Sequence, residues 1–129
     1  MELTISYSQL MVMNSDNQQP YVDWTPEDFE RGYAKVDGAI IFEAISDYTC
    51  EVEVTCGKHI EKEEVARTIS VPFTVKNEGV FITSILSNKL HIPIPNGEYM
   101  IVLQATPLEK PTDDELYKVR YDFCFESVE

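Results

Sequence analysis

The sequence predicts a mainly β fold: an antiparallel β-sandwich of about eight strands with one short helix near residues 26–35. Apolar and polar residues alternate over most of the chain, which is typical of half-buried strands. Only one segment carries a clear helix start. Short strands at regular spacing favour a sandwich, and a closed barrel is the alternative. Without an internal repeat or linker, residues 1–129 are expected to form a single domain.

The expected strands are defined by their alternation and by the turn residues between them. The apolar run 39–45 is typical of a central strand covered on both faces, and we expect it to form a hairpin with 48–56. Asn96-Gly97 predicts a hairpin turn, and Pro72 places its strand at a sheet edge or a bulge. A phase shift by Met13 suggests a bulge in the first strand. The expected strands are 2–13, 39–45, 48–56, 69–75, 80–86, 90–94, 99–105 and 119–125.

The helix is predicted from its first turn. Thr25 is a good N-cap and Pro26 suits the first helical position. Glu27 and Asp28 follow, where the helix dipole favours negative charge. We expect the helix to run from about Pro26 to Lys35, with Phe29 and Tyr33 on one face and Gly32 as a weak point inside it.

The charge balance restricts the possible partners. The chain has 23 acidic and 10 basic residues, a net charge of −13. Such a field repels nucleic-acid phosphates and anionic membranes, and it attracts basic protein surfaces. The plain alternative is that the acidity only keeps the protein in solution.

The cysteine count and the start of the sequence bear on the compartment. Three cysteines without dense spacing do not suggest a disulfide framework. No signal peptide or transmembrane run is visible, so we expect a cytoplasmic protein. Membrane association would then come only through a membrane-bound partner.

Catalytic and metal-binding patterns are weak in this sequence. His59 and His91 lack a third ligand, and Cys56 near His59 lacks a visible oxyanion hole. A calcium loop at 14–17 lacks the EF-hand spacing, and no phosphate loop or Ser-centred elbow is present. We therefore expect no enzyme activity, no metal and no cofactor. A carboxylate pair acting on a sugar would revive the enzyme alternative.

The strongest candidate site is a partner-binding surface around the only tryptophan. An exposed Trp24 among carboxylates would anchor a basic partner, whereas the alternative packs it as a hydrophobic staple against Phe29. A second acidic group near residue 113 could flank the same surface. The predicted partner-binding residues are Asp23, Trp24, Glu27, Asp28, Glu30, Asp113, Asp114 and Glu115.

Several ordered blocks resemble the competence protein J family. They include Asp23-Trp24-Thr25, Gly32-Tyr33-Ala34, Asp37-Gly38-Ala39-Ile40, Val71-Pro72-Phe73 and Pro95-Asn96-Gly97-Glu98-Tyr99. The resemblance covers most of the chain and is densest over the first 45 residues. It implies an inhibitor that binds the DNA-entry nuclease of genetic competence. An immunity-type or regulatory module for another basic protein is the alternative.

Overall fold

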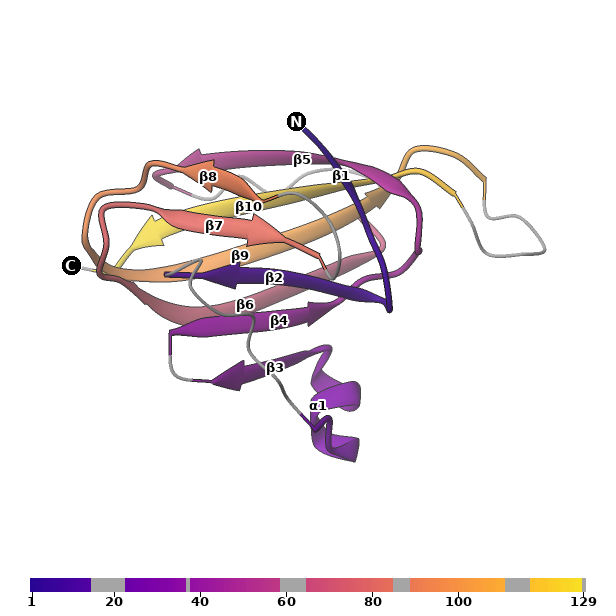
Figure 1. Cartoon of the computed structure of the whole chain (residues 1–129), viewed down its shortest axis with the longest axis horizontal. Coiled ribbons are helices and arrows are strands. Elements are labelled where there is room, and N and C mark those ends of the chain that lie inside the picture. Colours follow the sequence, from indigo (N-terminus) through magenta and orange to yellow (C-terminus); the bar gives the residue numbers. More distant parts are fainter. Residues whose placement is uncertain (15–22, 37, 59–64, 85–88, 111–116, 129) are drawn as a thin grey trace.

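The computed structural model describes residues 1–14, 23–36, 38–58, 65–84, 89–110 and 117–128. Two five-stranded sheets pack face to face, so the predicted mainly β sandwich is confirmed (Figure 1). Sheet A has the order β1 (Glu2–Thr4), β5 (Thr49–Cys56), β10 (Val119–Ser127), β9 (Gly97–Pro107), β6 (Arg67–Val75). Sheet B has the order β3 (Tyr33–Val36), β4 (Ala39–Glu43), β2 (Gln9–Met13), β7 (Val80–Thr83), β8 (Leu90–Ile92).

The helix is shorter than predicted. Helix α1 spans Pro26–Arg31 and ends at Gly32, which adopts a left-handed φ of 87°. A Cβ at Gly32 would lie 2.9 Å from Cδ1 of Ile69, so glycine serves both the turn and the close packing. The next four residues form β3, which pairs with β4. The extension of the helix to Lys35 was therefore wrong, and Gly32 is its C-terminal cap.

The two predicted hairpins were also wrong. Strands β4 and β5 lie in different sheets, and so do β8 and β9 on either side of Asn96. The chain crosses between the sheets at both places, and a local turn signal does not distinguish a crossover from a hairpin. The described residues contain ten strands, and β10 pairs with β5 in parallel within otherwise antiparallel sheets.

The predicted first strand is two strands in two sheets. The segment Ser6–Gln9 turns the chain from β1 in sheet A to β2 in sheet B. This turn explains the phase shift that suggested a bulge. By contrast, two positional predictions are confirmed: β4 is buried over its first four residues, and β6, which carries Pro72, is an edge strand of sheet A.

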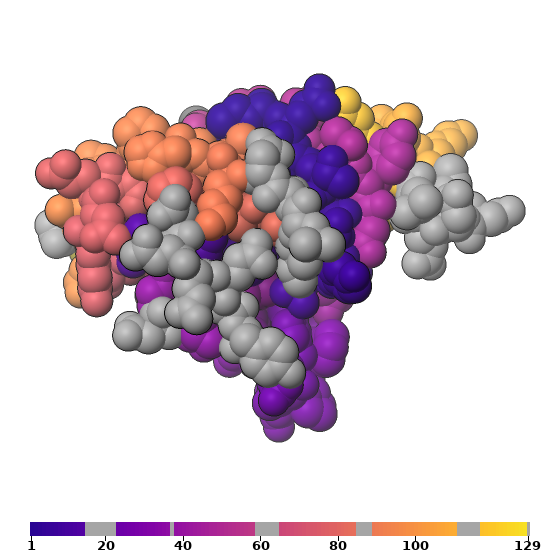
Figure 2. Space-filling model, in the orientation of Figure 1, coloured from indigo at the N-terminus to yellow at the C-terminus, as the bar shows by residue number. Residues whose placement is uncertain are grey.

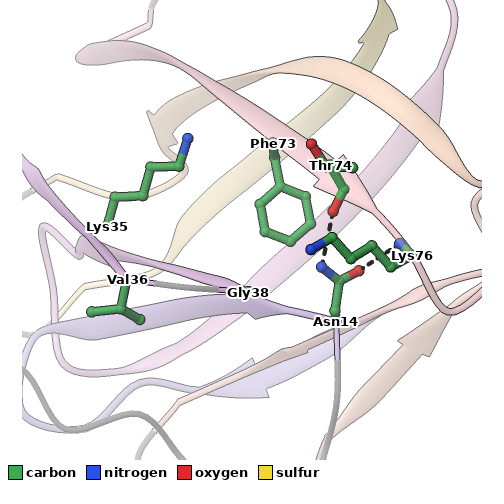
Figure 3. A pocket seen from close by; sticks show the side chains of 7 residues that line it. All are labelled: Asn14, Lys35, Val36, Gly38, Phe73, Thr74 and Lys76. Atoms are coloured by element: carbon green, nitrogen blue, oxygen red, sulfur yellow. Dashed lines mark hydrogen bonds between the residues drawn. The ribbon is translucent and has the colours of Figure 1, made fainter.

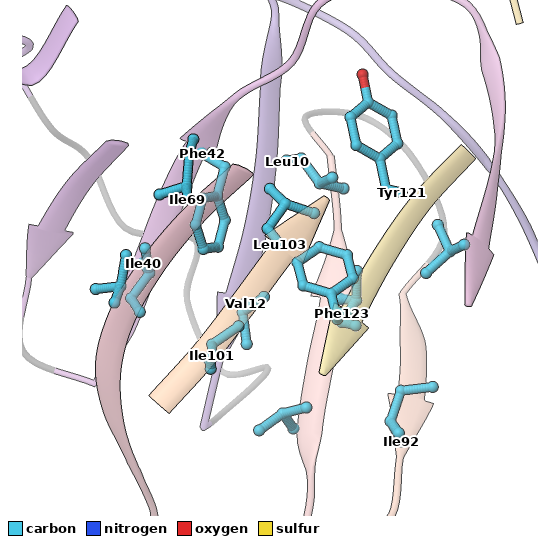
Figure 4. Packing of buried hydrophobic residues seen from close by; sticks show 14 of the residues in the cluster. Leu10, Val12, Ile40, Phe42, Ile69, Ile92, Ile101, Leu103, Tyr121 and Phe123 are labelled. Carbon is cyan, nitrogen blue, oxygen red and sulfur yellow. The ribbon is translucent and has the colours of Figure 1, made fainter. Parts of the chain in front are cut away.

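The core lies between the sheets (Figure 4), and its buried aromatic residues are Phe42, Phe73, Tyr99, Tyr121, Phe123 and Phe125. Phe42 of sheet B meets Phe123 of sheet A edge-on, with their ring centroids 5.9 Å apart. The hydroxyl of Tyr121 accepts a hydrogen bond from the Ile45 N–H at 3.1 Å. Burial raises the pKa of this phenol, so it stays neutral and serves the packing.

Asn14 joins the two sheets at one edge of the sandwich (Figure 3). Its Nδ2 donates to the Thr74 carbonyl at 2.9 Å, and its Oδ1 accepts from the Lys76 N–H at 3.0 Å. The backbone of Asn14 also donates to the Gly38 carbonyl and accepts from Asn77 Nδ2. Because Asn14 is only 7% exposed, these bonds satisfy polar groups that water reaches poorly.

Candidate partner-binding surface

The start of α1 is held by a complete capping box. Thr25 Oγ1 accepts from the Asp28 N–H at 3.2 Å, and Asp28 Oδ2 accepts from the Thr25 N–H at 3.1 Å. Asp28 Oδ1 also accepts from Arg31 at 2.7 Å. The backbone hydrogen bond from Thr25, aided by Arg31, lowers the pKa of Asp28. Asp28 is 8% exposed, so it stabilises the helix and offers little carboxylate surface to a partner.

Trp24 and Phe29 form the hydrophobic staple of this helix. They occupy the positions before the cap and at the fourth helical residue, and their ring centroids lie 5.1 Å apart. However, Phe29 is 59% exposed and Trp24 is half-buried. The staple therefore lies at the surface, and the same pair both stabilises the helix start and presents aromatic area to solvent.

Tyr7 is brought to the same region by a turn that sequence reasoning missed. Tyr7 and Ser8 both have a φ of 55°, and the Gln9 N–H donates to the Ser6 carbonyl at 3.2 Å. Positive φ at both central residues defines a type I′ turn, which usually takes Asn or Gly. The turn leaves the Tyr7 side chain 68% exposed.

The turn is held in place by hydrogen bonds to neighbouring elements. The Ser6 N–H donates to Ser84 Oγ at 2.9 Å, and the Ser8 N–H donates to Asp47 Oδ1 at 2.7 Å. The Ser8 carbonyl accepts from the Ala44 N–H at 2.8 Å. Unfavourable backbone conformations persist where surrounding structure fixes them, and they cluster at functional positions.

These elements enclose a small surface depression, which we call the aromatic hollow. It has a volume of about 160 Å³ and is lined by Tyr7, Ser8, Gln9, Trp24, Phe29 and Glu43. In Figure 2 the violet helix projects at the lower end of the molecule, below the indigo N-terminal strands. The sequence signal available for the hollow was limited to Trp24 and Phe29, because the other walls come from residues 7–9 and from Glu43, which are distant in sequence.

Carboxylates lie on the elements that form the hollow. Asp23, Glu27 and Glu30 are exposed beside Trp24 and Phe29 in sequence. Glu43 lines the hollow, with its Oε1 3.7 Å from Nη2 of Arg67. Asp23, Trp24, Glu27 and Glu30 of the predicted site lie within one short segment at α1, and of these four only Trp24 lines the hollow. Asp113, Asp114 and Glu115 lie outside the described residues, and their part in this surface stays a prediction.

The Cys50 and Cys124 thiols are buried within the fold, whereas Cys56 is exposed. Burial raises the pKa of the Cys50 thiol to about 12, so it carries no thiolate near neutral pH. Cys124 is buried and donates to the Gly57 carbonyl, while His91 packs against Phe81. Over the described ranges, no three His, Cys, Asp or Glu side chains are grouped to hold a metal ion. No helix there has the length and apolarity that crossing a membrane requires. His59, Asp16 and Asn17 lie outside the described residues.

Fold and surface together define a small β-sandwich with exposed aromatic and acidic side chains at the α1 end. Exposed aromatic side chains bordered by charged groups are typical of protein interfaces. The chain belongs to the competence protein J (ComJ) family, whose model matches residues 2–126. This confirms the resemblance found in the sequence.

Two similar proteins extend this comparison. The DNA-entry nuclease inhibitor of Bacillus subtilis (strain 168) is 36% identical over 108 residues, covering 84% of this chain and 82% of that protein. A crystal structure of ComJ from Bacillus subtilis, described as an inhibitor of the DNA degrading activity of NucA, matches with a TM-score of 0.82. That match has 33% identity and covers 97% of this chain and 93% of the other.

Proposed function

We propose that this protein inhibits a DNA-entry nuclease by binding it directly and non-covalently. The observation that carries the proposal is the similarity to a nuclease inhibitor over most of both chains, in sequence and in fold. The protein then acts as a binding partner and performs no chemistry of its own.

The proposed contact surface includes the carboxylates and aromatic rings around α1. A nuclease needs a basic cleft for DNA, and carboxylates can lie where phosphates would otherwise bind. Asp23, Glu27 and Glu30 supply such charge, and Trp24 supplies an aromatic anchor. Asp113, Asp114 and Glu115 would add a second acidic group. Long-range attraction then accelerates the encounter, and salt weakens it.

The test is a DNA-degradation assay with the cognate competence nuclease. The protein is titrated at a fixed nuclease concentration, at low and at moderate salt. We expect inhibition that saturates near an equimolar ratio and weakens as salt rises. A folded protein that leaves DNA degradation unchanged at every ratio contradicts the proposal.

A further inference from the structure

The aromatic hollow has the size of a receptor for one side chain. Its volume of about 160 Å³ is well below the roughly 300–1,000 Å³ of pockets that hold drug-sized ligands. A standard inhibitor interface is far larger than this hollow, and a few anchors near its centre carry most of the binding energy. An occupant of the hollow would therefore be one such anchor within a larger contact.

The walls of the hollow suit a positive charge. Tyr7, Trp24 and Phe29 contribute aromatic rings, and ring faces attract cations that come within about 6 Å of the centroid. The neighbouring surface already contains one such contact, because Arg31 Cζ lies 4.5 Å from the centre of the Tyr33 ring. Neither residue lines the hollow, but the contact is an example, close to α1, of the pairing between a guanidinium group and an aromatic face.

The charged groups around the hollow favour the same occupant. Glu43 lines it, and Asp47 holds the turn that presents Tyr7. Two cations lie nearby: Arg31 pairs with Asp28 at 2.7 Å, and Nη1 of Arg67 donates to the Glu43 carbonyl at 3.0 Å. Arg67 Nη2 reaches Glu43 Oε1 only at 3.7 Å, a loose pairing that leaves the carboxylate attractive to a second cation. Glu27 and Glu30 are exposed on the adjoining helix.

We infer that the aromatic hollow receives a basic side chain of the nuclease, which anchors the complex. The inference rests on the proposed function, since it specifies how that partner is held. Tyr7 and Phe29 enclose the basic group with Trp24, and Glu43 balances its charge. This assigns a binding role to Tyr7 and Glu43, two residues that the charge pattern of the sequence did not indicate.

The first experiment measures nuclease inhibition by variants of the hollow. Tyr7→Ala and Phe29→Leu each remove an aromatic ring from the hollow. Phe29→Leu keeps an apolar side chain of similar length, so it tests the ring itself. We expect the inhibition constant to weaken about 3- to 30-fold for each. Val128→Ala is the matched control, because Val128 is 56% exposed directly after β10, outside the lining of the hollow. This control should inhibit like the unchanged protein.

The second experiment tests the chemistry without the nuclease. Trp24 is the only tryptophan, so its fluorescence reports on the hollow. We expect tri-arginine peptide to change the Trp24 emission saturably, while tri-citrulline, which has the same shape without charge, does not. The arginine response should weaken in Phe29→Leu, and thermal unfolding monitored by circular dichroism should show that each variant is folded.

The outcomes separate the two proposals. If the unchanged protein inhibits the nuclease and folded Tyr7→Ala and Phe29→Leu inhibit equally well, the role of the hollow is refuted while the inhibitor function stands. Equal Trp24 responses to the arginine and citrulline peptides would also overturn it. A protein that never inhibits the nuclease but still distinguishes the peptides would refute the proposed function and retain the basic-group site.

Discussion

Aromatic rings occupy two contrasting regions of this protein. Between the sheets, Phe42, Tyr121 and Phe123 are at most 1% exposed and contact residues from both sheets. At the α1 end, Tyr7 and Phe29 are more than half exposed, and Trp24 is half-buried. The first group loses its contacts only when the protein unfolds. The second group has apolar area left to bury, so its contribution should appear in binding rather than in folding.

The largest effect should follow removal of a core ring. Phe42→Ala leaves a cavity opposite Phe123, and such substitutions cost about 3–5 kcal/mol of unfolding free energy. Urea denaturation monitored by circular dichroism measures the loss. A cost below about 1 kcal/mol would mean that Phe42 does not belong to the core region.

The next effect concerns the side chain that joins the two sheets. Asn14→Ala leaves the Thr74 carbonyl and the Lys76 N–H without their partners, and we expect a loss of about 2 kcal/mol. Asn77→Ala is the matched control, because it removes a single hydrogen bond to the Asn14 carbonyl. Denaturation of both variants should place Asn14→Ala clearly below Asn77→Ala in stability.

A smaller effect is expected at the helix start that supports the exposed rings. Thr25→Ala removes the side-chain acceptor of the cap, which typically costs about 1 kcal/mol. Thermal unfolding should register this loss, whereas Thr25→Ser, which keeps a hydroxyl, should stay close to the unchanged protein. Equal losses in the two variants would show that the cap hydrogen bond does not stabilise α1.

The same helix start should depend on pH through Asp28. The pKa of this carboxyl is lowered in the folded protein, so the unfolded state binds the proton more readily. The stabilisation is complete at pH values above the ordinary carboxyl pKa of 3.8. It is lost as the pH falls through the lower pKa that Asp28 has in the folded protein. Asp28→Asn should therefore destabilise the protein at pH 7 and progressively less at pH 3. A pH-independent difference in urea denaturation would contradict this.

The smallest effect on stability should come from an exposed ring. Phe29→Ala makes the same chemical change as Phe42→Ala, yet Phe29 keeps 59% of its surface in water. We expect a loss within about 0.5–1 kcal/mol, mostly from the staple with Trp24. Urea denaturation of the two phenylalanine variants side by side sharpens the comparison. Similar losses of unfolding free energy in the two variants would show that rings in the core and at the α1 end contribute equally to stability.

The predictable parts of the fold depend on neighbouring residues. Thr25-Pro26 marked the start of α1, and the unbroken apolar run of β4 indicated burial on both faces. The end of the helix was missed because Gly32 adopts a left-handed conformation, and residue periodicity does not report φ. The hairpin errors have a similar cause, since turn residues such as Asn96 do not specify which sheet the next strand joins.

The candidate site was predictable only where one segment contained it. Trp24 and its neighbouring carboxylates are adjacent in sequence and were found together. Tyr7 and Glu43 join them only because a turn with positive φ and the pairing of β2 with β4 bring distant segments together. The structural role of Asp28 was also missed, although Thr25 and Asp28 stand three residues apart, which is the sequence spacing of a capping box.

The central claim is that carboxylates on α1 guide this protein to a basic nuclease. The most direct test measures the association rate constant with the cognate nuclease against ionic strength for Glu27→Lys/Glu30→Lys. Glu78→Lys/Glu98→Lys is the matched control, because it makes the same change in net charge at two exposed positions. Glu78 precedes β7 and Glu98 lies at the start of β9, at the opposite end of the sandwich from α1 (Figure 1). At low salt, we expect the α1 variant to associate at least about 10-fold more slowly than the unchanged protein, and its rate constant to depend less on salt. The rate constant of the control variant should change less than about 3-fold. Equal rates and equal salt dependence in the two variants would contradict the claim.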